Sequence, residues 1–195
     1  MGQPSKAEQR RKDFLPQLAE AFSDLGYRRA TTSRLAELFG VEENILYRVW
    51  PSKKAMFLDA IEYVYQATIE TWEKVLSDDN DRTTAAERVL EYQAKKHGQM
   101  RLYRIIYAGL SETDDAEVRS ALRRLYKNFN QYIVRLLEEH RPEKSDDLPD
   151  TETVAWAIIG LGAIVDLQRE LGITSTEKRQ RLLKEMGQIM LDGTA

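Results

Sequence analysis

The sequence predicts an all-α protein of about nine helices, with a three-helix N-terminal domain and a larger helical C-terminal domain. Three observations carry this prediction. Apolar residues recur three and four positions apart along most of the 195 residues, which is the spacing of one helix face. No sustained alternation of apolar and polar residues, the pattern of a half-buried strand, interrupts it. Thr84 and Glu87 form a capping box, a signal for the start of a helix.

The composition is that of a globular protein and excludes some chemistry. Hydrophobic residues make up 42% and charged residues 31%, enough to bury a core. The chain has no cysteine, which excludes disulfides and thiolate chemistry. Residues 1–54 hold ten Lys and Arg against seven Asp and Glu, a balance of +3 within a net charge of −3. A basic end on an acidic body suits contact with a polyanion.

No stretch has the pattern of a membrane or export segment. The longest uncharged apolar run, residues 154–165, is shorter than the roughly 20 residues that span a bilayer. The polar N-terminus lacks the apolar stretch of a signal peptide. We therefore expect no membrane contact and a cytoplasmic location.

The first predicted helix ends at Gly26. Its apolar positions at helical spacing are Phe14, Leu18, Phe22 and Leu25. Pro16 lies inside this pattern, so we expect an irregularity at residues 13–16 and two helical pieces. A basic arm ahead of the helix consists of Lys6, Arg10, Arg11 and Lys12. This arm could be a solvated terminus, or it could contact phosphates or the minor groove of DNA.

Residues 32–51 have the pattern of a helix-turn-helix. Two short apolar-periodic segments, Thr32–Phe39 and Glu43–Trp50, are joined at Gly40, where the chain must reverse through a left-handed conformation that glycine adopts cheaply. The inward positions of the second segment are Leu46, Val49 and Trp50, and the outward positions are Asn44, Tyr47 and Arg48. In such a motif the second helix enters the major groove of DNA.

Short motifs follow one another along residues 10–60 in a specific order. They are Gly26-Tyr27, Thr31-Thr32, Leu35-Ala36, Phe39-Gly40-Val41, Leu46-Tyr47, the aromatic Trp50 and Ser52-Lys53-Lys54-Ala55. This order closely resembles the DNA-binding domain of the TetR (tetracycline-repressor-like) family of bacterial transcriptional regulators. The resemblance implies a helix-turn-helix DNA-binding domain over 1–54 and an effector-binding and dimerisation domain over 55–195.

The resemblance also implies which residues contact the DNA backbone. In the family, the second threonine, the tyrosine of the Leu-Tyr pair and the first lysine of the Ser-Lys-Lys-Ala motif do so. Here these are Thr32, Tyr47 and Lys53, and Arg34 is a further candidate for phosphate contact. Base reading falls to Glu43, Asn44, Ile45 and Arg48. Their side chains suit a cytosine amino group, adenine, a thymine methyl group and guanine, respectively.

The chain departs from the family at Glu42 and Glu43. The family commonly has a small capping residue at the first position and a basic or neutral residue at the second. Acidic side chains suit a helix N-terminus through its dipole, but they also repel phosphates. The alternative function is therefore a protein-interaction module that keeps the fold and binds DNA weakly or not at all. A third reading is a DNA-binding regulator without an effector.

Six further helices are predicted after Ser52. They are expected at 52 to about 77, 84 to about 100, 102–110, 111 or 113 to 140, about 151–171 and about 175–192. Residues 154–165 are apolar nearly all round and include small residues that let helices approach closely. In the resembled family the last two helices pair with those of a second subunit, so we expect a homodimer through them. The other reading is that these two helices form the core of the monomer.

The resemblance implies a small-molecule cavity in the C-terminal domain. Candidate lining residues are Tyr65, Gln93, His97, Tyr107, Tyr126, Asn130 and Trp156, although each could also pack in an ordinary core. The two histidines are far apart, so we expect no metal site and no cofactor. No nucleophile–base set, P-loop or dinucleotide glycine motif is present, so we expect no enzyme. The predicted function is a ligand-responsive repressor that binds a palindromic double-stranded DNA operator as a homodimer.

Overall fold

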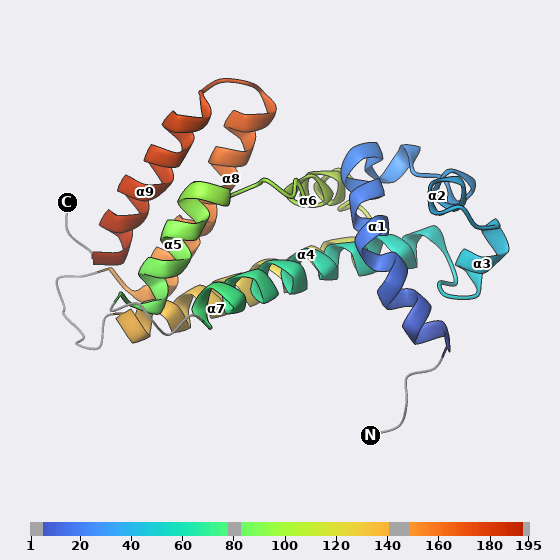
Figure 1. Cartoon of the computed structure of the whole chain (residues 1–195), viewed down its shortest axis with the longest axis horizontal. Coiled ribbons are helices and arrows are strands. Elements are labelled where there is room, and N and C mark those ends of the chain that lie inside the picture. The colour runs from blue at the N-terminus through green and yellow to red at the C-terminus, as the bar shows by residue number, and fades with distance from the viewer. Residues whose placement is uncertain (1–5, 78–82, 141–148, 193–195) are drawn as a thin grey trace. The chain divides into compact units, whose positions relative to one another are not determined.

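The computed structural model describes residues 6–77, 83–140 and 149–192, and these residues form nine helices and no strand (Figure 1). The helices are α1 (Lys6–Arg29), α2 (Thr32–Phe39), α3 (Glu43–Tyr47), α4 (Lys53–Leu76), α5 (Ala85–Lys96), α6 (Tyr103–Leu110), α7 (Ala116–His140), α8 (Thr151–Glu170) and α9 (Thr176–Asp192). The all-α prediction is therefore confirmed.

The chain divides into two compact units. Unit 1 comprises Met1–Ala67 and Met100–Leu125, and unit 2 comprises Thr68–Gln99 and Tyr126–Ala195. The helices α4 and α7 each begin in unit 1 and end in unit 2. The functional boundary that the sequence predicts after residue 54 falls at the start of α4, and it stays a prediction.

The core of unit 1 holds the helix-turn-helix in place. Its fully buried large side chains include Leu18, Phe22, Leu35, Leu46, Trp50, Met56, Phe57, Ile61 and Ile105. The ring of Phe57 lies 5.0 Å from that of Phe22, edge to face, and 4.7 Å from that of Tyr27. Aromatic pairs at such separations add to the stabilisation from burial. The first, second and fourth helices therefore share one packed interior with the short α3.

The expected break near Pro16 is wrong. The helix α1 passes through Pro16, and the interior residue with non-helical dihedral angles is Gly26, at φ 70° and ψ 171°. Proline has a φ compatible with a helix, although it removes one backbone hydrogen bond and its ring crowds the carbonyl of the residue four positions earlier. Pro16 is exposed, so water can satisfy the freed carbonyl. The chain bends at glycine because glycine adopts a positive φ cheaply.

Unit 2 packs α9 against both α5 and α8 (Figure 1). A larger core cluster includes Trp72, Tyr132, Leu137 and Ala155, and a smaller one joins Ala94, Val165 and Leu183. The predicted capping box at the start of α5 is present, with Thr84 and Glu87 satisfying each other's backbone N–H groups.

The predicted start of α7 is wrong. The helix begins at Ala116 instead of at residue 111 or 113, and the carboxylate of Asp115 accepts from the backbone N–H groups of Glu117 and Val118. The hydroxyl groups of Ser111 and Thr113 instead donate to the carbonyls of Tyr107 and Leu110 at the end of α6. They are therefore engaged with the preceding helix and do not cap the next one.

Candidate nucleic-acid interface

Local signals build the helix-turn-helix as the sequence predicts. The hydroxyl of Thr31 accepts from the N–H of Arg34 at 3.2 Å and caps α2. Gly40 ends this helix at φ 64° and ψ 32°, and the N–H of Val41 returns to the carbonyl of Ala36 at 3.0 Å. This left-handed cap reverses the chain toward α3.

Burial fixes the inner face of α3, and a hydrogen bond to the carboxylate of Asp59 fixes the turn that follows it. Leu46 and Trp50 are 0% and 1% exposed. The helix ends at Tyr47, earlier than predicted, but the N–H of Trp50 still donates to the carbonyl of Leu46 at 2.8 Å. The indole Nε1 of Trp50 donates to Oδ2 of Asp59 on α4 at 2.5 Å.

The same carboxylate binds Arg11 of α1. Arg11 donates from Nε and Nη2 to the two Asp59 oxygens at 2.5 and 2.6 Å, a bidentate pair. The hydrogen bond to Asp59 raises the pKa of the Arg11 guanidinium above its ordinary value. Arg11 thus lies within a helix and braces α3 through Asp59. The predicted basic arm is part of α1, where Lys6, Arg10 and Lys12 are exposed.

The outer face of α3 carries polar side chains. Asn44 and Arg48 are exposed, Tyr47 is 48% exposed and Ile45 is half-buried. The inward and outward positions therefore follow the apolar pattern of the sequence. Because Leu46 and Trp50 hold the opposite face, these outer side chains are presented from a rigid base.

Two of the residues predicted to contact DNA form a hydrogen bond with each other. The hydroxyl of Thr32 donates to the carboxylate of Glu43 and lies 3.2 Å from the hydroxyl of Tyr47. Glu43 is half-buried, and its charge is engaged by Thr32. No local pattern predicts this contact, because residues 32 and 43 lie on different helices.

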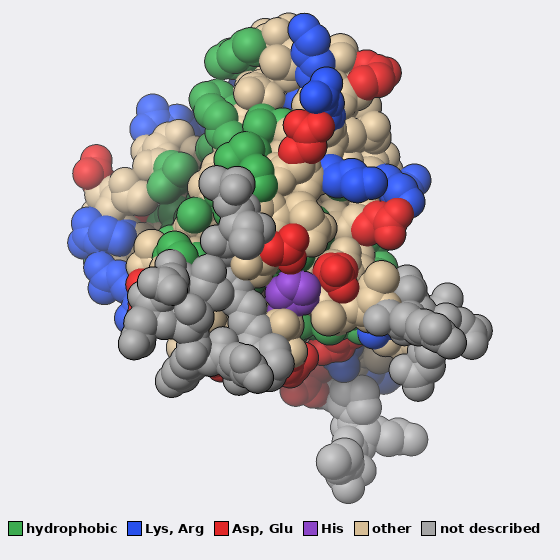
Figure 2. All heavy atoms as spheres, turned by 90° about the vertical axis from the view of Figure 1, so that its left-hand side faces the viewer, with side chains coloured by type: hydrophobic (Ala, Val, Ile, Leu, Met, Phe, Trp, Pro, Cys, Tyr) green, Lys and Arg blue, Asp and Glu red, His purple; other side chains and the backbone are tan. Residues whose placement is uncertain are grey.

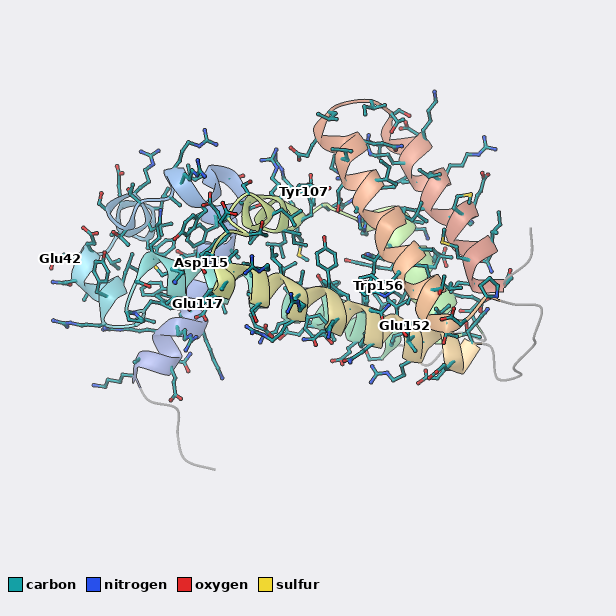
Figure 3. The ribbon with its side chains drawn as sticks, turned by 180° about the vertical axis from the view of Figure 1, so that it is seen from behind. Glu42, Tyr107, Asp115, Glu117, Glu152 and Trp156 are labelled. Carbon is teal, nitrogen blue, oxygen red and sulfur yellow. The ribbon has the colours of Figure 1, made fainter. Side chains whose placement is uncertain are left out.

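The adjacent Glu42 occupies the N-cap position of α3 without making a side-chain cap. Its carboxylate accepts from the Asn44 amide at 3.0 Å. Figure 3 shows Glu42 at the outer edge of unit 1. Because Glu42 is exposed, water and salt screen the repulsion between its carboxylate and a phosphate.

Lys53 and Arg34 differ in how far they are engaged within the chain. The ammonium of Lys53 donates to the carbonyl of Tyr27 at 3.0 Å and lies 4.3 Å from the centre of the Tyr27 ring. A lysine has three donors, so this contact leaves others. Arg34 is exposed and lies 3.7 Å from a carboxylate oxygen of Glu37, a distance at which a surface pair contributes little.

A charged contact that the sequence did not predict lies at the start of α7. The ammonium of Lys54 contacts Asp115 at 3.2 Å and Glu117 at 2.5 Å, and Figure 3 shows both carboxylates side by side. Hydrogen bonding, first to Glu117 and then to Asp115, raises the pKa of Lys54. This contact attaches the start of α4 to α7 inside unit 1. No short-range pattern could reveal it, since the partners are more than 60 positions apart.

The predicted ligand-pocket residues are distributed over both units. Tyr65 and Tyr107 belong to unit 1, and the other five belong to unit 2. In unit 2 the amide of Gln93 lies 3.1 Å from Nδ1 of His97, whose Nε2 lies 3.2 Å from the carbonyl of Gly162.

The remaining candidates in unit 2 have individual environments. Asn130 is buried and donates to the carbonyl of Glu152 at 3.4 Å, and Trp156 is 43% exposed. Burial, and secondarily Asp166, raises the pKa of Tyr126. As a set, the seven residues remain a prediction.

Two kinds of feature are absent from the described part of the chain. Residues 6–77, 83–140 and 149–192 contain no group of three His, Cys, Asp or Glu side chains placed to hold a metal ion. None of the helices formed by these residues has the length and apolar character of a membrane span.

The fold and the exposed face of α3 define the class of protein, a helix-turn-helix DNA-binding regulator. Residues 17–60 match the family model described as bacterial regulatory proteins, tetR family. This match covers the helix-turn-helix and identifies residues 17–60 as a DNA-binding domain of the TetR type. A fold of the TetR type implies DNA binding and dimerisation, and regulators of this type are generally not enzymes.

Individual proteins resemble the chain over most of its length. A nucleoid occlusion factor, SlmA, of Vibrio campbellii is 28% identical over 160 residues, covering 80% of each chain. A TetR-family transcriptional regulator of Cytophaga hutchinsonii superposes with a TM-score of 0.79 at 14% identity, covering 99% of this chain and 98% of that one. A transcriptional regulator of Saccharomonospora viridis, solved in complex with choline, gives a TM-score of 0.75 at 18% identity over 91% and 95% of the two chains. At these identities the two structures show the shared fold.

Proposed function

We propose that the protein is a cytoplasmic, ligand-responsive repressor that binds a palindromic DNA operator as a homodimer. The observation that supports DNA reading most directly is the outer face of α3. It presents Asn44, Tyr47 and Arg48 while Leu46 and Trp50 hold its inner face. A short helix fixed on one side and polar on the other fits the major groove.

The candidate residues divide by the part of DNA that they suit. Arg48 would pair with guanine, Asn44 with adenine and Ile45 with a thymine methyl group. Tyr47, Thr32, Arg34 and the remaining donors of Lys53 would contact phosphates. Glu43 is engaged by Thr32, so reading a cytosine would require it to release that hydroxyl or to share its second oxygen.

The Arg48→Ala variant should lose discrimination at one base position, by about 1–3 kcal/mol, while binding other sequence variants much as the parent does. The Arg34→Ala variant is the matched control, because it removes the same exposed charge from a phosphate-facing position. It should weaken binding to all sequences and reduce the dependence of log K on log salt by about 1.

Both variants can be compared by fluorescence anisotropy on the best duplex that the parent selects from a random library. Equal specificity profiles for the parent and Arg48→Ala would contradict the assignment. If the parent selects no sequence at all, the alternative of a protein-interaction module is favoured.

We further propose that the dimer forms through α8 and α9. Exposed apolar side chains accumulate on these helices and their connection, namely Trp156, Ile164, Leu167, Leu171, Ile173, Met186 and Ile189. Figure 2 shows hydrophobic side chains gathered on the face of the molecule that it draws. Contiguous exposed apolar area of this kind is typical of a protein–protein interface.

The double variant Ile164→Glu/Leu167→Glu should be a monomer of 22.6 kDa, whereas the parent should have twice that mass. Two carboxylates in a close apolar interface would have to be desolvated without partners, at a cost of several kcal/mol. Size-exclusion chromatography with light scattering measures the mass. The variant Gln131→Glu adds a charge at an exposed site of α7 and should remain a dimer. A dimeric double variant would place the interface elsewhere.

The ligand response is proposed from the fold. A structural neighbour binds choline, so a chain of this fold can hold a small molecule. The helices α4 and α7 contribute residues to both units, so a ligand that prefers one conformation could alter DNA binding by its difference in affinity. A thermal-shift screen of metabolites, followed by DNA binding with each hit, tests this proposal.

A second candidate function is that of a nucleoid occlusion factor. Relatives with this name match 76–80% of the chain in eight comparisons. Chromatin immunoprecipitation with sequencing separates the two roles. A repressor should occupy a few sites that overlap promoters. A factor with a role at the nucleoid should occupy many sites distributed over the chromosome, irrespective of promoters.

A further inference from the structure

A small polar cavity lies inside unit 2, where α5, α8 and α9 meet. Its volume is about 40 Å³, and the charged residues that line it are Lys95, Arg169 and Arg179, with His97 beside them. By the same measure one water needs about 10–15 Å³, so the space holds about three waters or one small ion. None of the described residues that line it is acidic.

Arg179 of α9 is a buried cation whose hydrogen-bond partners are neutral, and the carboxylate that acts on it through space is the exposed Glu177. It is 9% exposed, and it donates to the carbonyl of Thr174 and, at 3.0 Å, to the hydroxyl of Thr176. Its Nε is fully buried and has no hydrogen-bond acceptor among the described residues. A buried guanidinium that has no carboxylate within hydrogen-bond distance and leaves one donor unused is costly.

Arg169 of α8 presents a second buried donor. Its Nη2 donates to the carbonyl of His97, whereas its Nε is buried and lacks an acceptor in the described structure. Asp166 lies one turn earlier on α8 and is 6% exposed. Its Oδ1 lies 3.1 Å from Nε2 of His97 but has no well-oriented hydrogen bond.

The buried charges of this cluster do not balance, since Glu177 beside Arg179 is exposed to solvent. Two guanidinium groups, Arg169 and Arg179, accompany the one carboxylate of Asp166. The third cation at the cavity, Lys95, already contacts Glu91 at 2.7 Å on the surface. An uncompensated buried charge is stabilised by a counter-ion that also accepts the unused hydrogen bonds.

We propose that this cavity binds a small oxyanion, either a short carboxylate or an inorganic anion such as sulfate or phosphate. Its oxygens accept from Nε of Arg169 and Nε of Arg179, and its charge balances the cluster. The planar fork of a guanidinium suits oxyanions in particular. The site lies wholly within unit 2 and does not depend on whether α3 reads DNA.

The experiment measures the melting temperature of the full chain at constant ionic strength. Sodium gluconate is the reference salt, because the gluconate anion is too large for the cavity. Formate, acetate, sulfate and phosphate are each titrated to 20 mM in exchange for gluconate. At least one should raise the melting temperature saturably by about 3 °C. Choline gluconate, which supplies a cation, should not. Responses to carboxylates alone, or to inorganic anions alone, identify which kind the site prefers.

Three variants test the location. Arg169→Gln and Arg179→Gln should lose the anion-dependent shift, measured against each variant's own melting temperature. Arg181→Gln is the matched control, because Arg181 is exposed on α9 and pairs with Glu185 instead. It should keep the full shift. The proposal is overturned if no anion raises the parent's melting temperature, or if the Arg169 and Arg179 variants respond as the parent does. If Arg179→Gln does not fold, Arg169→Gln and the parent still decide.

Discussion

The Trp50→Ala variant should strongly destabilise unit 1 and weaken DNA binding at room temperature. Trp50 is 1% exposed and donates to Asp59, so its truncation removes a large apolar surface, leaves a cavity and removes one donor from a carboxylate. Truncating a buried tryptophan costs about 3–5 kcal/mol, a large part of the stability of a typical domain. Chemical unfolding followed by circular dichroism, alongside DNA binding, measures the effect.

The Trp50→Phe variant separates packing from the hydrogen bond. Phenylalanine keeps most of the apolar volume but cannot donate to Asp59, which still has Arg11 as its partner. This variant should cost about 1–2 kcal/mol and keep DNA binding. If alanine and phenylalanine cost the same, the indole hydrogen bond would outweigh burial, contrary to our expectation.

The Gly98→Ala variant should destabilise unit 2 by about 3 kcal/mol. Gly98 has φ 67°, and a Cβ added there would lie 2.7 Å from Oδ1 of Asp166 and 3.2 Å from Nε of Arg169. Alanine therefore meets both an unfavourable backbone conformation and a collision with a buried charged cluster. Thermal and urea unfolding measure the loss.

Gly172→Ala provides a closely matched control. Gly172 has φ 62° and belongs to the same unit, but a Cβ there would meet no atom within 4 Å. This variant should cost only the conformational strain, about 1 kcal/mol. Equal losses for the two variants would show that the collision at Gly98 is relieved by movement of Asp166 or Arg169.

Local patterns predicted the geometry of the helix-turn-helix well. The turn at Gly40, the cap at Thr31 and the burial of Leu46 and Trp50 each depend on residues a few positions apart. Hydrophobic spacing and turn chemistry report such short-range features directly. Pro16 misled the prediction because a proline is tolerated in a helix where its turn faces solvent.

Contacts between distant residues were beyond the reach of those patterns. Asp59 lies on α4 and accepts from Trp50, which follows α3 in the sequence. Thr32 of α2 donates to Glu43 of α3. Asp166 directly follows the apolar run 154–165 in the sequence, and it is buried beside His97. Single-sequence periodicity indicates which face of a helix is inward, but it does not indicate which inward polar groups meet.

The bracing of α3 has a consequence for protein engineering. The hydrogen bond that orients this helix comes from Trp50, three residues after its end. Trp50 donates to Asp59, whose other partner is Arg11. Transplanting α3 alone into another scaffold would therefore carry its outward-facing side chains without the groups that orient them. A functional graft would need the tryptophan, the aspartate and the arginine together, taken from three separate parts of the chain.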